Sequence, residues 1–133
     1  MRRVILVIAF AFLSSGTTMA QSYKPVTAVK ILTGWQCMAL ASSYEPGGYS
    51  ATPAPVFAGP GSAARKIGTG AGVIIVPKPL KVQDGRTVMI WPNGKEVWID
   101  VSQLTRWHSL SNPRATCEPA LMSNGRYGFK TSN

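Results

Sequence analysis

The sequence predicts an all-β fold whose centre is a small barrel of five short strands. Its apolar runs are short, rich in branched and aromatic residues, and separated by glycine, proline and asparagine turn signals. Asn93-Gly94 stands between two such runs, and Asn-Gly is the strongest short hairpin signal. Internal repeats, heptads and long amphipathic helices are absent from the sequence. Extra strands are expected before the barrel, and a tail after it.

The first twenty residues have the three-part pattern of a secretory signal peptide. Two arginines precede an unbroken apolar run of ten residues, Val4–Leu13, and a stretch of small residues ends at Ala20. The run is too short to span a bilayer as a helix, although an uncleaved anchor helix is the alternative. We therefore predict cleavage after Ala20 and a soluble mature protein, periplasmic or secreted, with no transmembrane segment.

Residues 21–53 form the expected N-terminal extension. Residues 26–32 and 35–41 are predicted strands separated by Thr33-Gly34, while a helix over 26–41 is the alternative because Ala, Leu and Met favour helices. Residues 42–55 contain three prolines and two consecutive glycines, which predicts a loop.

Residues 54–107 are predicted to form the barrel. Residues 56–70 begin as its first strand, continue as a glycine- and proline-rich loop and lead into the next strand. The later segments are strands at 72–77, 86–91 and 95–100, a helical turn at 101–104 and a short last strand at 105–107. The hairpin around Asn93-Gly94 joins two of these strands.

Residues 108–133 are polar and rich in Gly, Ser and Asn, so we expect a tail tied back only at Cys117. Cys37 and Cys117 are the two cysteines of the chain, and in an oxidising compartment this predicts one disulfide. Two unrelated buried thiols are the alternative. A metal site is not expected, because two distant cysteines and the single His108 do not supply four zinc ligands.

The chain is strongly basic. It has 14 Lys and Arg residues against 5 Asp and Glu, and loss of residues 1–20 leaves 12 against 5, a net charge of +7. Such a surface attracts anionic polymers or lipid headgroups. The cations are scattered, and no basic stripe or binding motif points to nucleic acid, so we expect no nucleic-acid partner.

The glycines of residues 56–72 also suggest phosphate binding, which the context excludes. Gly68-Thr69-Gly70-Ala71-Gly72 is similar to a dinucleotide loop, but such loops need a helix after them, so that helix N–H groups point at phosphate. The sequence that follows is a strand ended by prolines. No cofactor is therefore predicted.

Three segments resemble the bacterial SH3-like (SH3b) domains of exported proteins. They are Ala54–Ser62 with its Gly59-Pro60 pair, Lys66–Ile75, and Asn93–Leu104 with Gly94 four residues before Trp98. The resemblance spans residues 54–107, about half of the mature chain. It implies an SH3-like barrel, and it implies non-catalytic binding of a cell-wall polymer, peptidoglycan, or of an envelope protein.

A groove between the loops at 58–66 and 77–86 is the predicted binding surface. Aromatic rings offer flat contact area there, and cations add affinity for anions. The candidate residues are Phe57, Arg65, Lys66, Lys78, Trp91, Trp98 and Trp107. Because a barrel this small needs a core, at least two of the four tryptophans of the chain are expected to be structural.

The function predicted from the sequence is an exported, non-catalytic binding module. The alternative is an accessory subunit of an envelope or secretion assembly, with residues 26–40 as an apolar interface. A small secreted hydrolase is a third hypothesis, but His108 would be its general base and no nucleophile motif accompanies it. No catalytic residue is therefore assigned.

Overall fold

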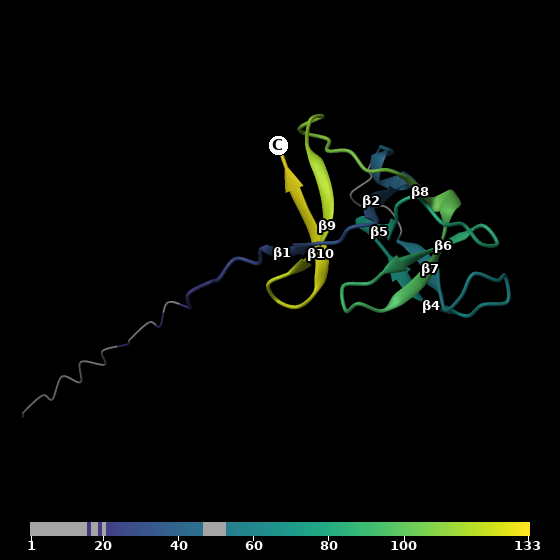
Figure 1. The fold of residues 1–133 in the computed structure, drawn as a ribbon, viewed down its shortest axis with the longest axis horizontal. Coiled ribbons are helices and arrows are strands. Elements are labelled where there is room, and N and C mark those ends of the chain that lie inside the picture. The colour runs from purple at the N-terminus through teal and green to yellow at the C-terminus, as the bar shows by residue number, and fades with distance from the viewer. Residues whose placement is uncertain (1–15, 17–18, 20, 47–52) are drawn as a thin grey trace, which may run out of the picture.

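The computed structural model describes Gly16, Met19, residues 21–46 and residues 53–133. The expected signal peptide lies almost wholly outside these residues. The described chain is all-β and forms two antiparallel sheets, one of seven strands and one of three (Figure 1). No helix in the described ranges is long and apolar enough to cross a membrane.

The large sheet has the strand order β4-β3-β7-β6-β5-β2-β8. Its strands are β2 (Trp35–Leu40), β3 (Ala54–Phe57), β4 (Lys66–Gly70), β5 (Val73–Pro77), β6 (Arg86–Ile90), β7 (Glu96–Asp100) and β8 (Leu104–Arg106). The predicted strand at 35–41 is confirmed, and the helix alternative for 26–41 is wrong. The predicted helical turn before the last strand is the 3-10 helix η3 (Val101–Gln103).

The described strands do not close into a five-stranded barrel, which corrects the sequence prediction. The large sheet is open, with β4 and β8 at its two edges. Strand β2, assigned to the extension, lies between β5 and β8, and β4 adds a strand beyond β3. The sequence did not predict this because strand order is decided by pairing between distant segments, whereas local patterns indicate only where strands occur.

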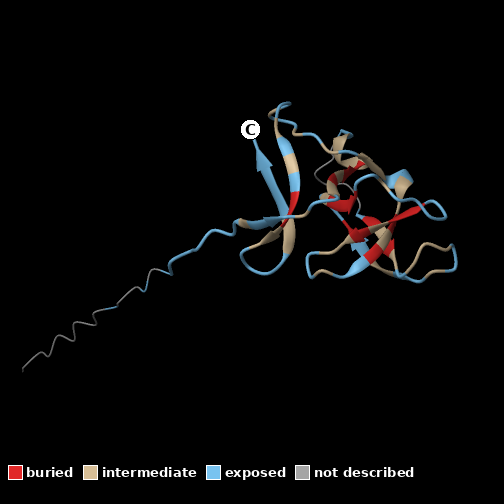
Figure 2. Ribbon diagram, viewed as in Figure 1, coloured by how far each residue is buried: buried red, intermediate tan, exposed pale blue. Residues whose placement is uncertain are grey.

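Most of the buried residues lie in strands of the large sheet (Figure 2). Alternate residues of each strand point to the same side. Val56, Val97 and Ile99 are fully buried for this reason, together with Ile74 and Val76 of β5. The branched residues that suggested strands in the sequence therefore also supply the core.

The hairpin of β6 and β7 has the predicted Asn-Gly turn. Arg86 lies opposite Asp100 and Ile90 opposite Glu96 across the two strands. The Trp91 N–H donates to the carbonyl of Lys95, and Gly94 has a φ of 87°, a conformation that glycine adopts without a steric penalty.

The expectation of a tail tied back only at Cys117 is wrong. Residues after the large sheet form β9 (Thr116–Met122) and β10 (Tyr127–Ser132), which join β1 (Ala28–Ile31) in the order β1-β9-β10. The Tyr127 N–H donates to the carbonyl of Pro92, which ties this small sheet to the β6–β7 turn. The polar composition concealed these strands, because their stability comes from pairing and from packing of few apolar residues.

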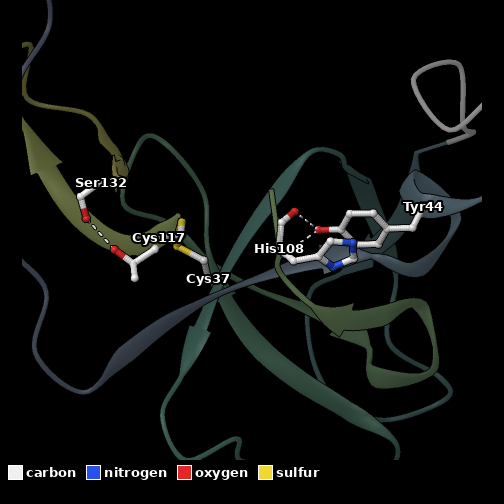
Figure 3. Close-up of a disulfide and its surroundings, with 6 residues drawn as sticks. Cys37, Tyr44, His108, Cys117 and Ser132 are labelled. Carbon is white, nitrogen blue, oxygen red and sulfur yellow. Dashed lines mark hydrogen bonds between the residues drawn. A yellow bond between two sulfur atoms is a disulfide. The ribbon is translucent and has the colours of Figure 1, made fainter. Parts of the chain in front are cut away.

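A disulfide joins the two sheets, as the sequence predicted. Cys37 of β2 and Cys117 of β9 have Cα atoms 6.0 Å apart, and the bridge spans 80 residues of sequence (Figure 3). The small sheet is therefore attached covalently to β2, the strand next to the β8 edge of the large sheet.

Candidate binding site

A pocket of about 340 Å³ lies beside the end of β2. Four segments form it: the end of β2, the 3-10 helix η1 (Ala41–Tyr44), the turn between β4 and β5, and the chain after β8. Its lining residues are Ala39, Leu40, Ser43, Tyr44, Ala71, Gly72, Val73, Trp107, His108, Ser109 and Leu110. Residues up to 71 positions apart in the sequence thus meet in one site.

Tyr44 and His108 contact each other directly in the lining of this pocket. Their rings are stacked, with centroids 3.8 Å apart and an angle of 17° between the planes. The Tyr44 hydroxyl accepts a hydrogen bond from the His108 backbone N–H and donates one to the His108 carbonyl, both at 2.9 Å (Figure 3). These contacts hold η1 against the segment after β8 and fix the pocket wall.

The pocket is largely apolar, and His108 adds an imidazole ring to its lining. Ala39 and Leu40 are buried at its base, and Val73 is half-buried. Ser43 and Ser109 add hydroxyl groups, and the lining includes no Lys, Arg, Asp or Glu. On a basic chain, such a pocket suits a neutral group with an apolar face.

Trp107 is the predicted binding residue that lies in this pocket, where it is half-buried. Trp91 lines a different pocket of about 250 Å³ between the two sheets, with Tyr127 and Phe129. A methyl group on Gly68 would come within 3.0 Å of the Trp91 ring, so this tryptophan packs closely on β4.

Phe57 and Trp98 lie on a different part of the large sheet. They face each other across β3 and β7, and both are half-buried. The Arg86 guanidinium carbon lies 3.4 Å from the centroid of the Phe57 ring, a cation–π contact. One face of Phe57 is therefore occupied by this contact within the protein.

The three predicted cations Arg65, Lys66 and Lys78 are exposed and line neither of these two pockets. The seven candidates therefore do not converge on one site.

Sequence reasoning missed Arg86, which links the two loops of the predicted groove. Its side chain donates to Asp100 Oδ1 at 2.8 Å and to the carbonyls of Gly61 and Gly59 at 2.7 and 3.3 Å. The pairing of Arg86 with Asp100 could have been predicted from the hairpin, because two strands joined at Asn93-Gly94 place these two residues opposite each other. The pairing of Tyr44 with His108 had no such signal, since 64 residues separate them.

Comparisons with protein-family models, with curated proteins and with solved structures gave no match. The chemistry of the site therefore rests on its own geometry.

Proposed function

We propose that this chain is an exported, non-catalytic binding module that holds a neutral portion of a cell-wall polymer in the pocket of Tyr44, Trp107 and His108. The observation that carries the proposal is an aromatic pocket without Lys, Arg, Asp or Glu in its lining, on a chain of net charge +9. The volume of about 340 Å³ is that of a small-ligand pocket.

The lining residues suit a sugar ring. The C–H faces of a pyranose pack on flat aromatic rings such as Trp107, which also lose little conformational entropy on binding. The hydroxyls of Ser43 and Ser109 lie in the same lining and can exchange hydrogen bonds with sugar hydroxyls. The basic surface outside the pocket adds long-range attraction to an anionic wall.

The arrangement of the central strands supports an SH3-like module. A tight hairpin, β6–β7, is followed by the 3-10 helix η3 and the short strand β8, as in the resemblance of residues 54–107. The Gly59-Pro60 loop is held by the Arg86 side chain. In this proposal the ligand pocket lies at the β8 end of the sheet, outside the groove between the loops at 58–66 and 77–86.

Retention on purified peptidoglycan across a salt series tests this function. Replacing Trp107 with Ala should weaken binding at least tenfold at physiological salt, because the aromatic wall is lost. The matched control is Arg65→Ala with Lys78→Ala, which lowers the charge outside the pocket and should weaken only the low-salt component.

Two results would contradict the proposal. One is wild-type retention that disappears at physiological salt, which indicates nonspecific charge. The other is a Trp107→Ala protein that is correctly folded and retained as well as the wild type.

An accessory subunit of an envelope assembly is a second candidate function. It is favoured by exposed apolar residues at and before β1: Val26, Val29 and Ile31 are 45%, 61% and 39% exposed. Chemical cross-linking in intact envelopes tests it, and recovery of the chain only as a monomer would count against it.

A further inference from the structure

The outer edge of β1 is an unpaired sheet edge among the described residues. β1 pairs with β9 on one side and ends the small sheet on the other. The Leu32 N–H donates to the Pro119 carbonyl, and successive residues of a strand direct their N–H groups to opposite sides. The N–H and carbonyl of Ile31 therefore point away from β9, toward the free edge.

This edge is apolar as well as unpaired. Val29 and Ile31 are exposed, and they lie beside a groove of about 450 Å³ that also includes Met122 and Phe129. Phe129 is 42% exposed. An added strand would cover Val29 and Ile31 of β1 while it pairs with the backbone of Ile31.

The charged residues beside the groove favour a partner strand with acidic side chains. Lys30 and Lys130 line it, and no carboxylate does. Across β10 and β9, Lys130 lies opposite Glu118. Across β1 and β9, Lys30 lies opposite Leu121, so the cation of β1 has no acidic residue directly across from it.

The same features disfavour pairing with a second copy of this chain. Two β1 strands would bring two Lys30 side chains together, and like charges repel. A register irregularity between Ala28 and Lys30 further disrupts a flat self-complementary edge. A strand with acidic side chains is attracted to Lys30 and does not meet this repulsion. The charge of Lys30 therefore favours an acidic partner strand over a second copy of β1.

We propose that the outer edge of β1 accepts an extended segment of a partner protein, in which apolar residues alternate with Asp or Glu. This inference rests on the second candidate function, that of an accessory subunit, and names the chemistry of its partner. The apolar residues of the segment bury Val29 and Ile31, its carboxylates face Lys30 and Lys130, and its backbone pairs with Ile31.

A phage-displayed library of random decapeptides, panned against the purified protein, tests the proposal. Enriched sequences should alternate branched apolar residues with Asp or Glu. Ile31→Pro should weaken their binding at least tenfold, because it deletes the outward N–H while leaving the N–H groups directed at β9. Ile31→Ala is the matched control, since it shortens the side chain but keeps the N–H, and its loss should be smaller.

If the Ile31→Pro protein does not fold, the double variant Lys30→Glu, Lys130→Glu tests the same proposal through its charge. It should weaken acidic peptides at least tenfold at low salt and enrich basic peptides instead. Enrichment of proline-rich or basic sequences by the wild type, no enrichment, or equal binding to Ile31→Pro would overturn the proposal. A dimer of the wild type in analytical ultracentrifugation that Ile31→Pro dissociates would overturn it in favour of a second copy.

Peptide binding and cross-linking distinguish the proposed β1 edge site from the accessory function. Acidic strands that bind β1, without any envelope partner in cross-linking, would leave the edge chemistry intact and remove the accessory function. An envelope partner cross-linked only at the Trp107 pocket would remove the β1 proposal.

Discussion

Arg86 is the buried cation that joins three parts of the large sheet. It is 8% exposed, forms an ion pair with Asp100 across the β6–β7 hairpin, and bonds to two carbonyls of the glycine- and proline-rich loop. It also covers one face of Phe57. Burial of a guanidinium is costly unless its donors are bonded, and here they are bonded to a carboxylate and to backbone oxygens. Arg86 therefore holds the loop at 58–65 in place.

Arg86→Lys should lower the free energy of unfolding by about 2–4 kcal/mol. An ammonium group keeps the charge but cannot reproduce the planar set of bonds to Asp100, Gly59 and Gly61. Urea denaturation measures the change. Arg65→Lys is the matched control at an exposed position, where the change should be within about 0.5 kcal/mol, and equal losses at both positions would contradict the role of Arg86.

Two hairpins, β6–β7 and β9–β10, turn at glycines of positive φ, but only at Gly94 would an added methyl group meet another strand. A methyl group at Gly94 would lie 3.0 Å from Cε2 of Tyr127, whereas one at Gly125 would have nothing within 4 Å. Their φ angles are similar, 87° and 79°. The β6–β7 turn therefore has a second role, as the place where the small sheet packs on the large one.

Gly94→Ala and Gly125→Ala should separate these two roles. Gly125→Ala should cost about 1–2 kcal/mol of stability from backbone strain alone. Gly94→Ala should cost more, because the Tyr127 ring must also move. Thermal or urea unfolding of the two variants measures the difference, and a Gly94→Ala protein no less stable than Gly125→Ala would mean that the Tyr127 contact adds nothing.

At the scale of the whole molecule, the disulfide connects the sheet that carries the core to a sheet that has little core of its own. The buried core cluster lies entirely within the large sheet and its connections, whereas Ala120 is a buried residue of the small one. The small sheet consequently depends on contacts with the large sheet, and Cys37–Cys117 limits how far the two can separate.

The stability losses caused by replacing the two cysteines should be non-additive. Cys37→Ser and Cys117→Ser should destabilise to a similar extent, and the double variant should be little worse than either, because each removes the same bridge. The chain-entropy model for a loop of 80 residues gives an upper value of about 4.5 kcal/mol. Urea denaturation of the three variants measures this, and losses that add would contradict it. Amide exchange should speed up first in β9 and β10.

Much of the fold could be predicted from local patterns. The run around Val76 became a strand because a short continuous apolar segment of branched residues suits a strand buried on both faces. The run around Val97 became a strand because its apolar residues alternate in burial, and Asn93-Gly94 became a hairpin because its backbone adopts the required turn. The small sheet was not predicted, since β9 and β10 lack a strong apolar alternation. Of the residues that line the candidate pocket, only Trp107 was among the predicted binding residues, because Tyr44 and His108 are 64 positions apart and meet only in the folded chain.

The sequence by itself determined the all-β class, the β6–β7 hairpin, the 3-10 turn before β8 and the pairing of the two cysteines, because each depends on neighbouring residues or on simple counting. Only the tertiary structure decided that the large sheet stays open, that residues 116–132 join β1, and that Tyr44 meets His108. The physical reason is the same in each case. These features arise from contacts between segments far apart in the chain, and local sequence does not encode which distant surfaces meet.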